Sequence, residues 1–364
     1  MCSGYFIGLM SGTSLDGVDV SLCKISKNHF SCEGSYYLKM EQSLKDELLS
    51  MIEGETTLAQ VGRVDHKLAI FFAEAVNAFL KQEKIEAKEI VAIGSHGQTL
   101  WHEPKGENPF SMQLGNASVL AVETGIDVVT DFRSKDIALG GEGAPFAPAF
   151  HNFLFSKIKK CAVLNIGGMA NISILGENLI GYDTGCGNVL MDMWISEIRD
   201  LPYDRDGLWA KMGNIDEKLL ENMLKDDYFN LNYPKSTGRE YFNKVFLIKY
   251  IEPYRDTLSP EDIEATLLAL TVHSIANEIK KFDIEELLVS GGGADNLYLM
   301  EMLQRELPNI KVSKTERYGI SSDNMEAMIF AWLAYKRLNR ESISLKSVTG
   351  AKNNTILGGV YARS

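Results

Sequence analysis

The sequence predicts an α/β protein whose two halves share one architecture. An apolar run at 5–10 leads through a glycine-containing turn into a second strand pattern at 18–25. The same outline returns at 161–166, where a Gly-Gly pair interrupts an apolar run that resumes at 171–175. Helical and strand patterns alternate between and after these hairpins, as in α/β layers around a central sheet. Two such hairpins favour a duplicated architecture, although a chance likeness would produce the same outline.

The remaining elements follow from periodicity. Apolar residues at helical spacing, including Leu68, Phe72 and Phe79, predict an amphipathic helix. Short apolar runs predict three strands, and longer periodic stretches predict three more helices. The strands are expected at 89–93, 126–130 and 287–290, and the helices at 261–281, from Asn296 onward and at 324–337. The stretch 200–240, which carries several Asp residues, is expected to be an exposed insertion.

Length and composition limit the class of protein. At roughly 150 residues per domain, the 364 residues correspond to two domains or one large domain. A hydrophobic share of 45% with 24% charged residues excludes a disordered or low-complexity chain. The formal net charge of −12 argues against nucleic acid and anionic membranes as partners.

The cysteines and the N-terminal segment indicate a compartment. The five cysteines are odd in number and form no CxxC motif, and Cys23 and Cys161 lie in apolar runs where a buried thiol is expected. The first residues lack the basic start of a signal peptide, and no apolar run is long enough to span a membrane. A cytoplasmic protein is therefore expected.

Several turns suit a phosphate group. They follow expected strands and combine glycines, which allow close backbone approach, with Asp, Asn, Ser or Thr. No glycine is followed by lysine, so a Walker A loop is absent. The run from Gly185 to Leu190 imitates a dinucleotide fingerprint but lacks its third glycine. A nucleotide would therefore be held by a different loop scheme.

Three glycine-rich segments carry a resemblance to a known superfamily. MSGTSLDGVD at 10–19, NIGGMANIS at 165–173 and SGGGADN at 290–296 resemble the phosphate-1, phosphate-2 and adenosine segments of actin-like sugar kinases. More narrowly, the chain resembles the anhydro-N-acetylmuramic acid kinase family. Further matching segments are GSHGQTLWH (94–102), QLGNAS (113–118), DFRSKDIALGGEGAP (131–145), YDTGCGNVLMD (182–192), KSTGREYFN (235–243), ISSDNMEAMIFAWLA (320–334) and VTGA (348–351). Two residues depart from the family pattern, since Cys186 replaces the usual proline and Glu142 a common glutamine.

The resemblance implies a fold and a reaction. The fold would be the two-lobed actin-like ATPase/sugar kinase fold, with duplicated ribonuclease H-like domains and an interdomain cleft. One lobe would comprise 1–130 with 345–364, and the other 131–344. The enzyme would use ATP, Mg²⁺ and water to open the ring of 1,6-anhydro-N-acetylmuramic acid, giving N-acetylmuramic acid 6-phosphate in peptidoglycan recycling. A homodimer is also implied.

The resemblance also assigns site residues. Asp183, between a strand pattern and a glycine turn, would be the catalytic base, although an Asp there also suits the cap of a helix starting near Asn188. Side chains expected to bind the sugar are His96, Gln98, Arg133 and Glu326. Arg133 in an ordinary surface salt bridge and Glu326 as a solvated helix charge are the alternatives. No histidines pair at HExxH spacing, so a zinc site is not expected.

The nucleotide is expected to lie on three turns. Its binding residues would be Gly12, Thr13, Ser14, Leu15, Asp16, Gly17, Val18, Asp19, Asn165, Gly167, Gly168, Gly291, Gly292 and Gly293. Asp16 or Asp19 would hold Mg²⁺ through water, because Mg²⁺ keeps most of its hydration shell. A glycine triplet can also be a plain turn between a strand and a helix.

Two other functions remain open at this point. One is a kinase of an ordinary hexose or amino sugar, which the same ATP loops would serve. The other is a non-catalytic actin-like module that binds ATP and acts through interactions, although no peptide-binding extension is visible. ATP consumption with different sugars separates these possibilities.

Overall fold

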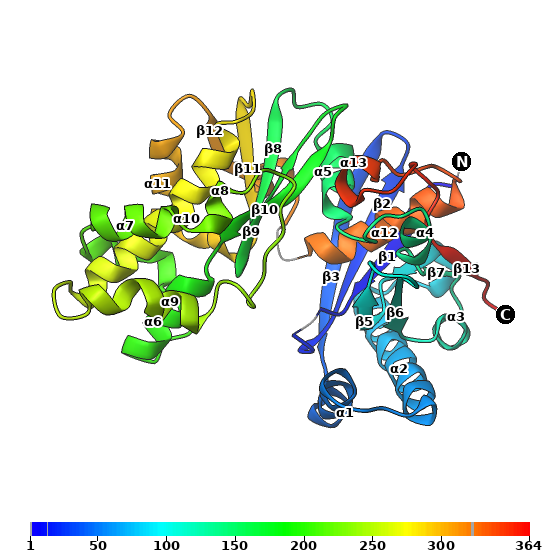
Figure 1. Ribbon diagram of the computed structural model, residues 1–364. Coiled ribbons are helices and arrows are strands. Elements are labelled where there is room, and N and C mark those ends of the chain that lie inside the picture. The colour runs from blue at the N-terminus through cyan, green and yellow to red at the C-terminus, as the bar shows by residue number, and fades with distance from the viewer. Residues whose placement is uncertain (1, 13, 322–323) are drawn as a thin grey trace. The chain divides into compact units, whose positions relative to one another are not determined.

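The computed structural model describes residues 2–12, 14–321 and 324–364. The chain divides into two compact units, Met1–Phe150 with Asn324–Ser364, and His151–Asp323. The first unit extends past the expected border at 130/131. It also takes up residues 324–344, which were expected in the other unit, because helix α12 (Met325–Leu338) packs on strands β1 and β4 (Figure 1).

The first unit contains a six-stranded sheet of order β13-β7-β4-β1-β2-β3. The first three strands form an antiparallel meander, while β4 is parallel to β1 and β7 is parallel to β4. The strands are β1 (Gly4–Met10), β2 (Gly17–Ser26), β3 (His29–Lys39), β4 (Ile90–Ser95), β7 (Val128–Thr130) and β13 (Gly359–Tyr361). A separate hairpin pairs β5 (Gln98–Glu103) with β6 (Phe110–Leu114).

Helices cover both faces of this sheet. Ile7 and Leu9 belong to the same buried cluster as the apolar face of α2 (Leu58–Glu83), whereas Phe6 packs edge-on against Tyr335 of α12. Because neighbouring strand residues point to opposite faces, α2 and α12 lie on opposite sides. The first unit also contains α1 (Gln42–Glu53), α3 (Ala117–Thr124), α4 (Ser134–Ala138) and α13 (Lys346–Thr349), whereas α5 (Ala147–Leu154) crosses the border at 150/151.

Two glycines allow α12 to approach the sheet closely. A Cβ at Gly8 would lie 1.8 Å from the Ala327 carbonyl oxygen, and one at Gly94 would lie 1.9 Å from the Phe330 carbonyl oxygen. No side chain fits at either distance. The glycines therefore set the depth at which α12 packs.

The second unit repeats the same sheet. Its order is β10-β9-β8-β11-β12, with three antiparallel strands followed by two parallel ones. The strands are β8 (Cys161–Ile166), β9 (Met169–Ile174), β10 (Ile180–Cys186), β11 (Glu286–Ser290) and β12 (Lys311–Lys314). This matches β3-β2-β1-β4-β7 strand for strand. The predicted duplication is confirmed.

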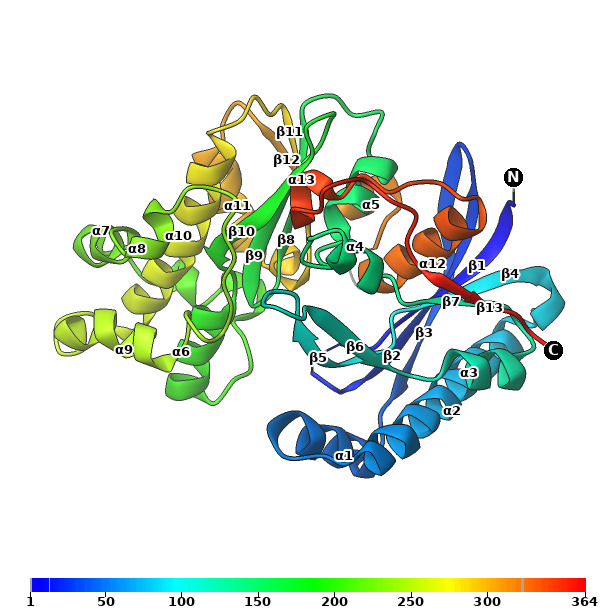
Figure 2. The ribbon, with the colours of Figure 1, turned by 45° about the vertical axis from the view of Figure 1, so that its right-hand side comes forward.

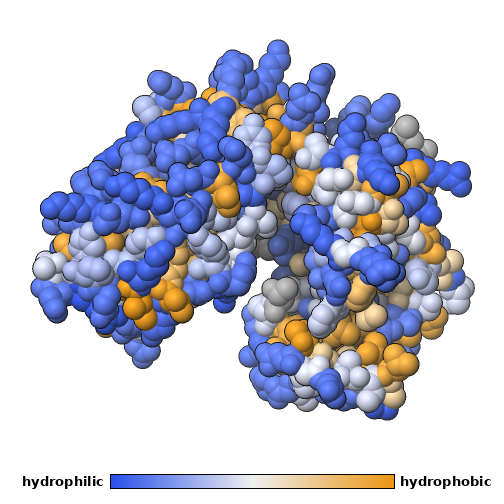
Figure 3. Space-filling view, in the orientation of Figure 1, coloured by the Kyte–Doolittle hydropathy of each residue, from blue (hydrophilic) through white to orange (hydrophobic). Residues whose placement is uncertain are grey.

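Helix α10 (Pro260–Ile279) is the centre of the second unit's helical layer. It is buried along almost its whole length, and α6, α7 and α9 are grouped around it in Figures 1 and 2. The surrounding helices are α6 (Val189–Arg199), α7 (Glu217–Leu224), α8 (Asp227–Asn230), α9 (Lys244–Ile251) and α11 (Leu297–Glu306). Hydrophilic side chains cover most of the outer surface near α7, α10 and α11 (Figure 3).

The expectation of an exposed insertion at 200–240 is wrong. Apolar residues of this stretch, Trp209, Leu219, Leu220, Met223 and Tyr228, are buried in the core of the second unit. Acidic residues lie between them in the sequence, so the stretch is polar on average although it is folded.

The other predicted elements are confirmed within the described residues. The helices at 68–79, 261–281 and 324–337 and the strand at 287–290 correspond to α2, α10, α12 and β11. Cys23 and Cys161 are buried free thiols, as expected. No helix among the described residues has both the length and the apolar character needed to cross a membrane.

Glu264 of α10 gives the first prediction. Its carboxylate is fully buried, and neither oxygen has a hydrogen-bond partner among the described residues. Burial raises its pKa well above the ordinary value, and the carboxylates of Asp204 and Asp192 raise it further. Its stabilising contribution is therefore complete below the unfolded-state pKa of about 4.3 and is lost as the pH rises through the folded-state pKa.

Glu264→Gln removes this titration. The free energy of unfolding of the variant, relative to the unsubstituted chain, is expected to increase as the pH is raised from about 5 to about 8. Urea unfolding at several pH values measures it, with the exposed Glu221→Gln as the control. A difference that stays constant with pH would contradict an uncompensated buried carboxyl at this position.

Candidate functional site

Asp183 lies on β10 with its carboxylate held on one side. Oδ2 accepts hydrogen bonds from the Thr237 amide at 3.0 Å and the Ser236 hydroxyl at 3.1 Å. Oδ1 accepts none from any residue that the structure describes. Burial raises the pKa of Asp183, the two hydrogen bonds lower it and Glu240 raises it, with a net upward shift. The group thus has one fixed oxygen and one oxygen available for a proton.

The structure does not support the alternative role of Asp183 as a helix cap. Helix α6 begins at Val189 with Asn188 at the cap position and no side-chain capping bond. The amides of Asn188 and Val189 instead donate to the carbonyls of Gly167 and Gly168. Asp183 therefore does not cap helix α6.

The predicted phosphate-2 and adenosine turns lie together in the second unit. Gly291 has a φ of 78°, and a Cβ there would lie 2.6 Å from Oδ1 of Asn165. A Cβ at Gly293 would lie 2.3 Å from the Ile166 side chain. Gly292 and Gly168 have more open surroundings. A Cβ at Gly292 would lie 3.9 Å from the side-chain nitrogen of Asn188, and one at Gly168 would lie 3.9 Å from Nη2 of Arg239. Packing thus requires glycine at 291 and 293, while 168 and 292 offer accessible backbone.

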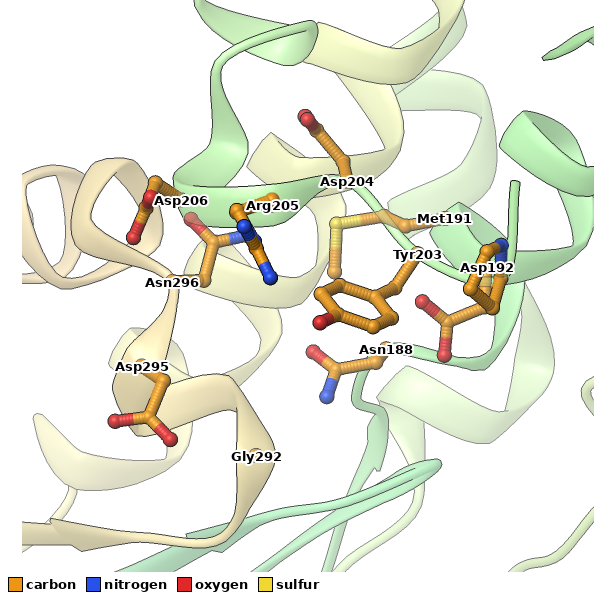
Figure 4. Close-up of a pocket in the computed structure, with 11 residues that line it drawn as sticks. Asn188, Met191, Asp192, Tyr203, Asp204, Arg205, Asp206, Gly292, Asp295 and Asn296 are labelled. Carbon is orange, nitrogen blue, oxygen red and sulfur yellow. The ribbon is translucent and has the colours of Figure 1, made fainter.

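A pocket of about 610 Å³ adjoins the turn at 291–293 within the second unit (Figure 4). Figure 4 shows the Tyr203 ring beside Asn188, with Arg205 on one side and Asp192 on the other. Burial raises the pKa of Asp192 to about 6, while Arg239 lowers it. An aromatic ring among polar groups next to glycine-rich backbone suits a nucleoside with phosphates.

In the first unit, His96 and Arg133 form a fixed pair. Nε and Nη2 of Arg133 donate to Nε2 of His96 at 3.2 and 2.8 Å, and Nη1 donates to the Gly143 carbonyl at 2.9 Å. Since arginine only donates, Nε2 of His96 accepts and its Nδ1–H donates to the Gly97 carbonyl at 2.8 Å. Burial and the Arg133 charge lower the pKa of His96 to about 3, so the imidazole is neutral.

This pairing changes the interpretation of both residues. Burial lowers the pKa of Arg133 to about 10, which leaves it charged at neutral pH. In the contacts described, one N–H of Nη1 and one of Nη2 remain for another acceptor, which is the fork that binds a carboxylate. The exposed salt bridge considered as the alternative for Arg133 is absent from the described residues. His96 orients the guanidinium rather than titrating.

The other predicted sugar residues lie in the same unit. Gln98 is buried, and its Oε1 accepts from the Ser11 hydroxyl at 2.7 Å. The Gly17 carbonyl is a second acceptor for the same hydroxyl, at 3.0 Å. Glu326 is accessible at the start of α12. Loss of solvation and the Asp19 carboxylate raise the pKa of Glu326, whereas Arg133 lowers it. Asp19, Arg133 and Glu326 are therefore electrostatic neighbours.

The predicted phosphate-1 turn is partly described. Thr13 lies outside the described residues. The side chains of Leu15 and Val18 are buried, so only their backbone faces a ligand, and Leu15 has a positive φ of 54°. Gly17 opens β2, where a Cβ would lie 2.3 Å from the Leu38 carbonyl oxygen.

Two residues of this turn, Ser14 and Asp16, are bound by one lysine. Lys45 donates to the Ser14 carbonyl at 3.0 Å and to Oδ1 of Asp16 at 2.8 Å. The bond from Lys45 lowers the pKa of Asp16. The backbone around Gly12 is tied locally, since the Leu15 amide donates to its carbonyl. The Asp16 carboxylate is thus engaged by Lys45.

The contacts of the carboxylates indicate which of them suit a Mg²⁺ ion. No group of three or more His, Cys, Asp or Glu residues able to hold a metal occurs among the described residues. Mg²⁺ needs no such group, because it usually keeps several waters and one or two carboxylates. Two carboxylates, Asp19 and its electrostatic neighbour Glu326, fit that requirement.

The two departures from the family pattern have simple surroundings. Cys186 is a fully buried thiol, 4.0 Å from the Thr271 hydroxyl, and burial raises its pKa to about 12. Glu142 is paired with Lys105 at 2.7 Å, a contact that a glutamine would make without the charge. Neither touches Asp183 or Arg133 in the described contacts.

Some site residues were missed from the sequence. Ser236 and Thr237, which bind Asp183, and Arg239, near Gly168, come from a segment matched to the family but given no role. Their hydroxyl and guanidinium groups beside a glycine were the available signal. The lining residues Asn188 and Tyr203 were missed as well.

The comparisons with known proteins cover nearly the whole chain. Residues 4–363 match the family model described as anhydro-N-acetylmuramic acid kinase. The chain is 58% identical to the protein of that name from Sulfurovum sp. (strain NBC37-1), over 98% of both chains. It is 52% identical to the one from Sulfurimonas denitrificans, over 99% of this chain and 100% of the relative, and 49% identical to the one from Aliivibrio fischeri, over 98% of both. The predicted resemblance is confirmed: the chain belongs to the anhydro-N-acetylmuramic acid kinase family.

Proposed function

We propose that Asp183 is the general base with which this kinase opens its anhydro sugar. The carrying observation is the asymmetric carboxylate, in which Oδ2 accepts two hydrogen bonds and Oδ1 accepts none from the described residues. In an anhydro sugar O6 is bonded to C1 and carries no proton, so the base acts on water instead.

The proposed reaction couples the opening of the sugar ring to transfer of the γ-phosphoryl group. A water oxygen bonds to C1 while the C1–O6 bond breaks, and Oδ1 of Asp183 takes the water's proton. O6 bonds to the γ-phosphorus of ATP while the bond from that phosphorus to ADP breaks. The products are N-acetylmuramic acid 6-phosphate and ADP. Positioning and charge stabilisation supply most of the catalysis in such phosphoryl transfers.

The two units are assigned different substrates. In the first unit, Arg133, oriented by His96, would bind the lactyl carboxylate of the sugar, with Gln98 and Glu326 near its hydroxyl or amide groups. In the second unit, the pocket beside Tyr203 and the accessible backbone of the glycine turns would bind ATP. Arg239, whose Nη2 lies 3.9 Å from an ideal Cβ on Gly168, would face the phosphates.

Magnesium would be held through water by Asp19, with Glu326 nearby. The ion would neutralise charge on the phosphoryl oxygens when bound. We also propose that the protein is cytoplasmic and forms a homodimer. Light scattering of the purified protein tests the oligomeric state.

Substrate choice tests the proposal directly. ADP release is expected with anhydro-N-acetylmuramic acid and to be at least tenfold slower with N-acetylmuramic acid or glucose, because only the anhydro sugar offers O6 as a leaving group. A coupled ADP assay measures all three under one set of conditions. Equal rates with glucose would favour an ordinary hexose kinase.

A further inference from the structure

A buried ion pair lies behind Asp183 in the second unit. The side chains of Lys235 and Glu278 are 2% and 4% exposed, and Nζ of Lys235 is 2.7 Å from Oε1 of Glu278. Oε2 of Glu278 accepts from the Tyr182 hydroxyl at 2.9 Å and from Lys281 at 2.6 Å. Lys235 also donates to the Tyr228 carbonyl at 3.3 Å. The charges are therefore well satisfied.

The same residues surround Asp183. The Asp183 amide donates to the Lys235 carbonyl at 3.0 Å, and the Tyr228 hydroxyl donates to the Asp183 carbonyl at 2.8 Å. The two residues after Lys235 supply both donors to Oδ2. Residues 235–237 thus contact the backbone and the carboxylate of Asp183. The ammonium group of Lys235 ties this segment to α10.

The segment is irregular in its backbone. Residues 235–237 belong to no helix or strand, whereas β10, α8 and α10 around them are regular elements and lie next to one another in Figures 1 and 2. Burying two charges costs solvation, and an apolar pair of the same volume is often at least as stable. General stability is therefore a weak explanation for a charged pair at this place. Fixing one position of a segment is a better one.

We propose that the Lys235–Glu278 ion pair is a positioning device that holds residues 235–237 against β10, so that Asp183 keeps Oδ2 bonded and Oδ1 free. This inference rests on the proposed role of Asp183 as the base. Lys235 and Glu278 act through Ser236 and Thr237 and do not touch the reacting atoms.

The position of the segment controls the acidity of the base. Hydrogen bonds from Ser236 and Thr237 favour the ionised carboxylate and lower the pKa of Asp183, against the effects of burial and Glu240. The other charged groups near β10 are paired with one another: Lys235 and Lys281 both bind Glu278. Asn171, which is opposite Asp183 on β9, is neutral. Loss of the two donors is expected to raise the pKa of Asp183.

The test replaces both charges together, as Lys235→Met with Glu278→Met, which avoids leaving one buried charge unpaired. Turnover at neutral pH is expected to fall about 10- to 100-fold, as for a misplaced catalytic group. The KM values for ATP and the sugar should stay within about threefold. The acid limb of the pH profile of kcat should move to higher pH, by about one unit. The single variant Lys235→Arg, which keeps the charge and Glu278, should retain most of the activity.

A matched control removes a different ion pair of the same unit. Lys311 and Glu286 are 2.6 Å apart on β12 and β11, and neither has a described contact with Asp183. Lys311→Met with Glu286→Met should leave kcat and the pH profile unchanged. Circular dichroism and thermal unfolding establish whether each double variant is folded.

The outcomes separate this inference from the proposed function. If Asp183→Asn retains full turnover, the proposed base is wrong. If Asp183→Asn is inactive but the folded Lys235/Glu278 variant keeps wild-type kcat and its pH profile, the positioning role is overturned. Should that variant not fold, Ser236→Ala removes one donor to Oδ2, and an unmoved acid limb would then overturn the proposal.

Discussion

Asp183→Asn is expected to lower turnover by roughly 10²- to 10⁴-fold, the range for loss of a general base. Asparagine keeps the shape of the side chain, and its Oδ1 can still accept from Ser236 and Thr237, which bind Oδ2 of the native residue. It cannot take a proton from water. Steady-state kinetics of ADP release measures the change.

The KM for ATP separates catalysis from binding in this variant. It should change little, because Asp183 does not line the pocket beside Tyr203. Asp200→Asn, at the left-handed C-cap of α6, is the control and should behave like the unsubstituted protein. Full turnover of Asp183→Asn, or a loss explained entirely by ATP binding, would contradict the assigned role.

Arg133→Lys is expected to raise the KM for the sugar by roughly 10- to 100-fold, corresponding to about 1.5–3 kcal/mol for lost hydrogen bonds to a charged group. A lysine has no planar fork and cannot both bind Nε2 of His96 and present two parallel donors. The KM for ATP should stay nearly constant. Initial rates with each substrate varied in turn measure both values.

The exposed substitution Arg63→Lys, on α2, controls for the general effect of losing a guanidinium. It should leave both KM values unchanged. A defect of Arg133→Lys confined to ATP would move Arg133 from the sugar site to the phosphate site.

Local patterns predicted the two sheets well. The hairpins β1–β2 and β8–β9 follow from apolar runs broken by glycine, and these are contacts between neighbours in sequence. The expected border at 344/345 differs from the observed one at 323/324 because α12 returns to the first sheet after the whole second unit. Its close packing depends on Gly8 and Gly94, whose lack of a side chain leaves no periodic signal.

The candidate site divides in the same way. A strand end followed by glycine suits either a carboxylate at a site or a helix cap, and the family resemblance is what favoured the catalytic role for Asp183. Its partners Ser236 and Thr237 lie 53 and 54 residues later, and His96 lies 37 residues from Arg133. Such pairings depend on which loops the sheets bring together. Residue types alone therefore gave candidate groups, and the fold supplied their hydrogen bonds, protonation and orientation.

Reaction in heavy-oxygen water tests the central claim most directly. If Asp183 activates water for attack at C1, label enters the sugar at C1 and is absent from the transferred phosphate, read by mass spectrometry before the anomeric hydroxyl exchanges. Label in the phosphate group of the product would mean that water attacks phosphorus, and would contradict ring opening with Asp183 as the base.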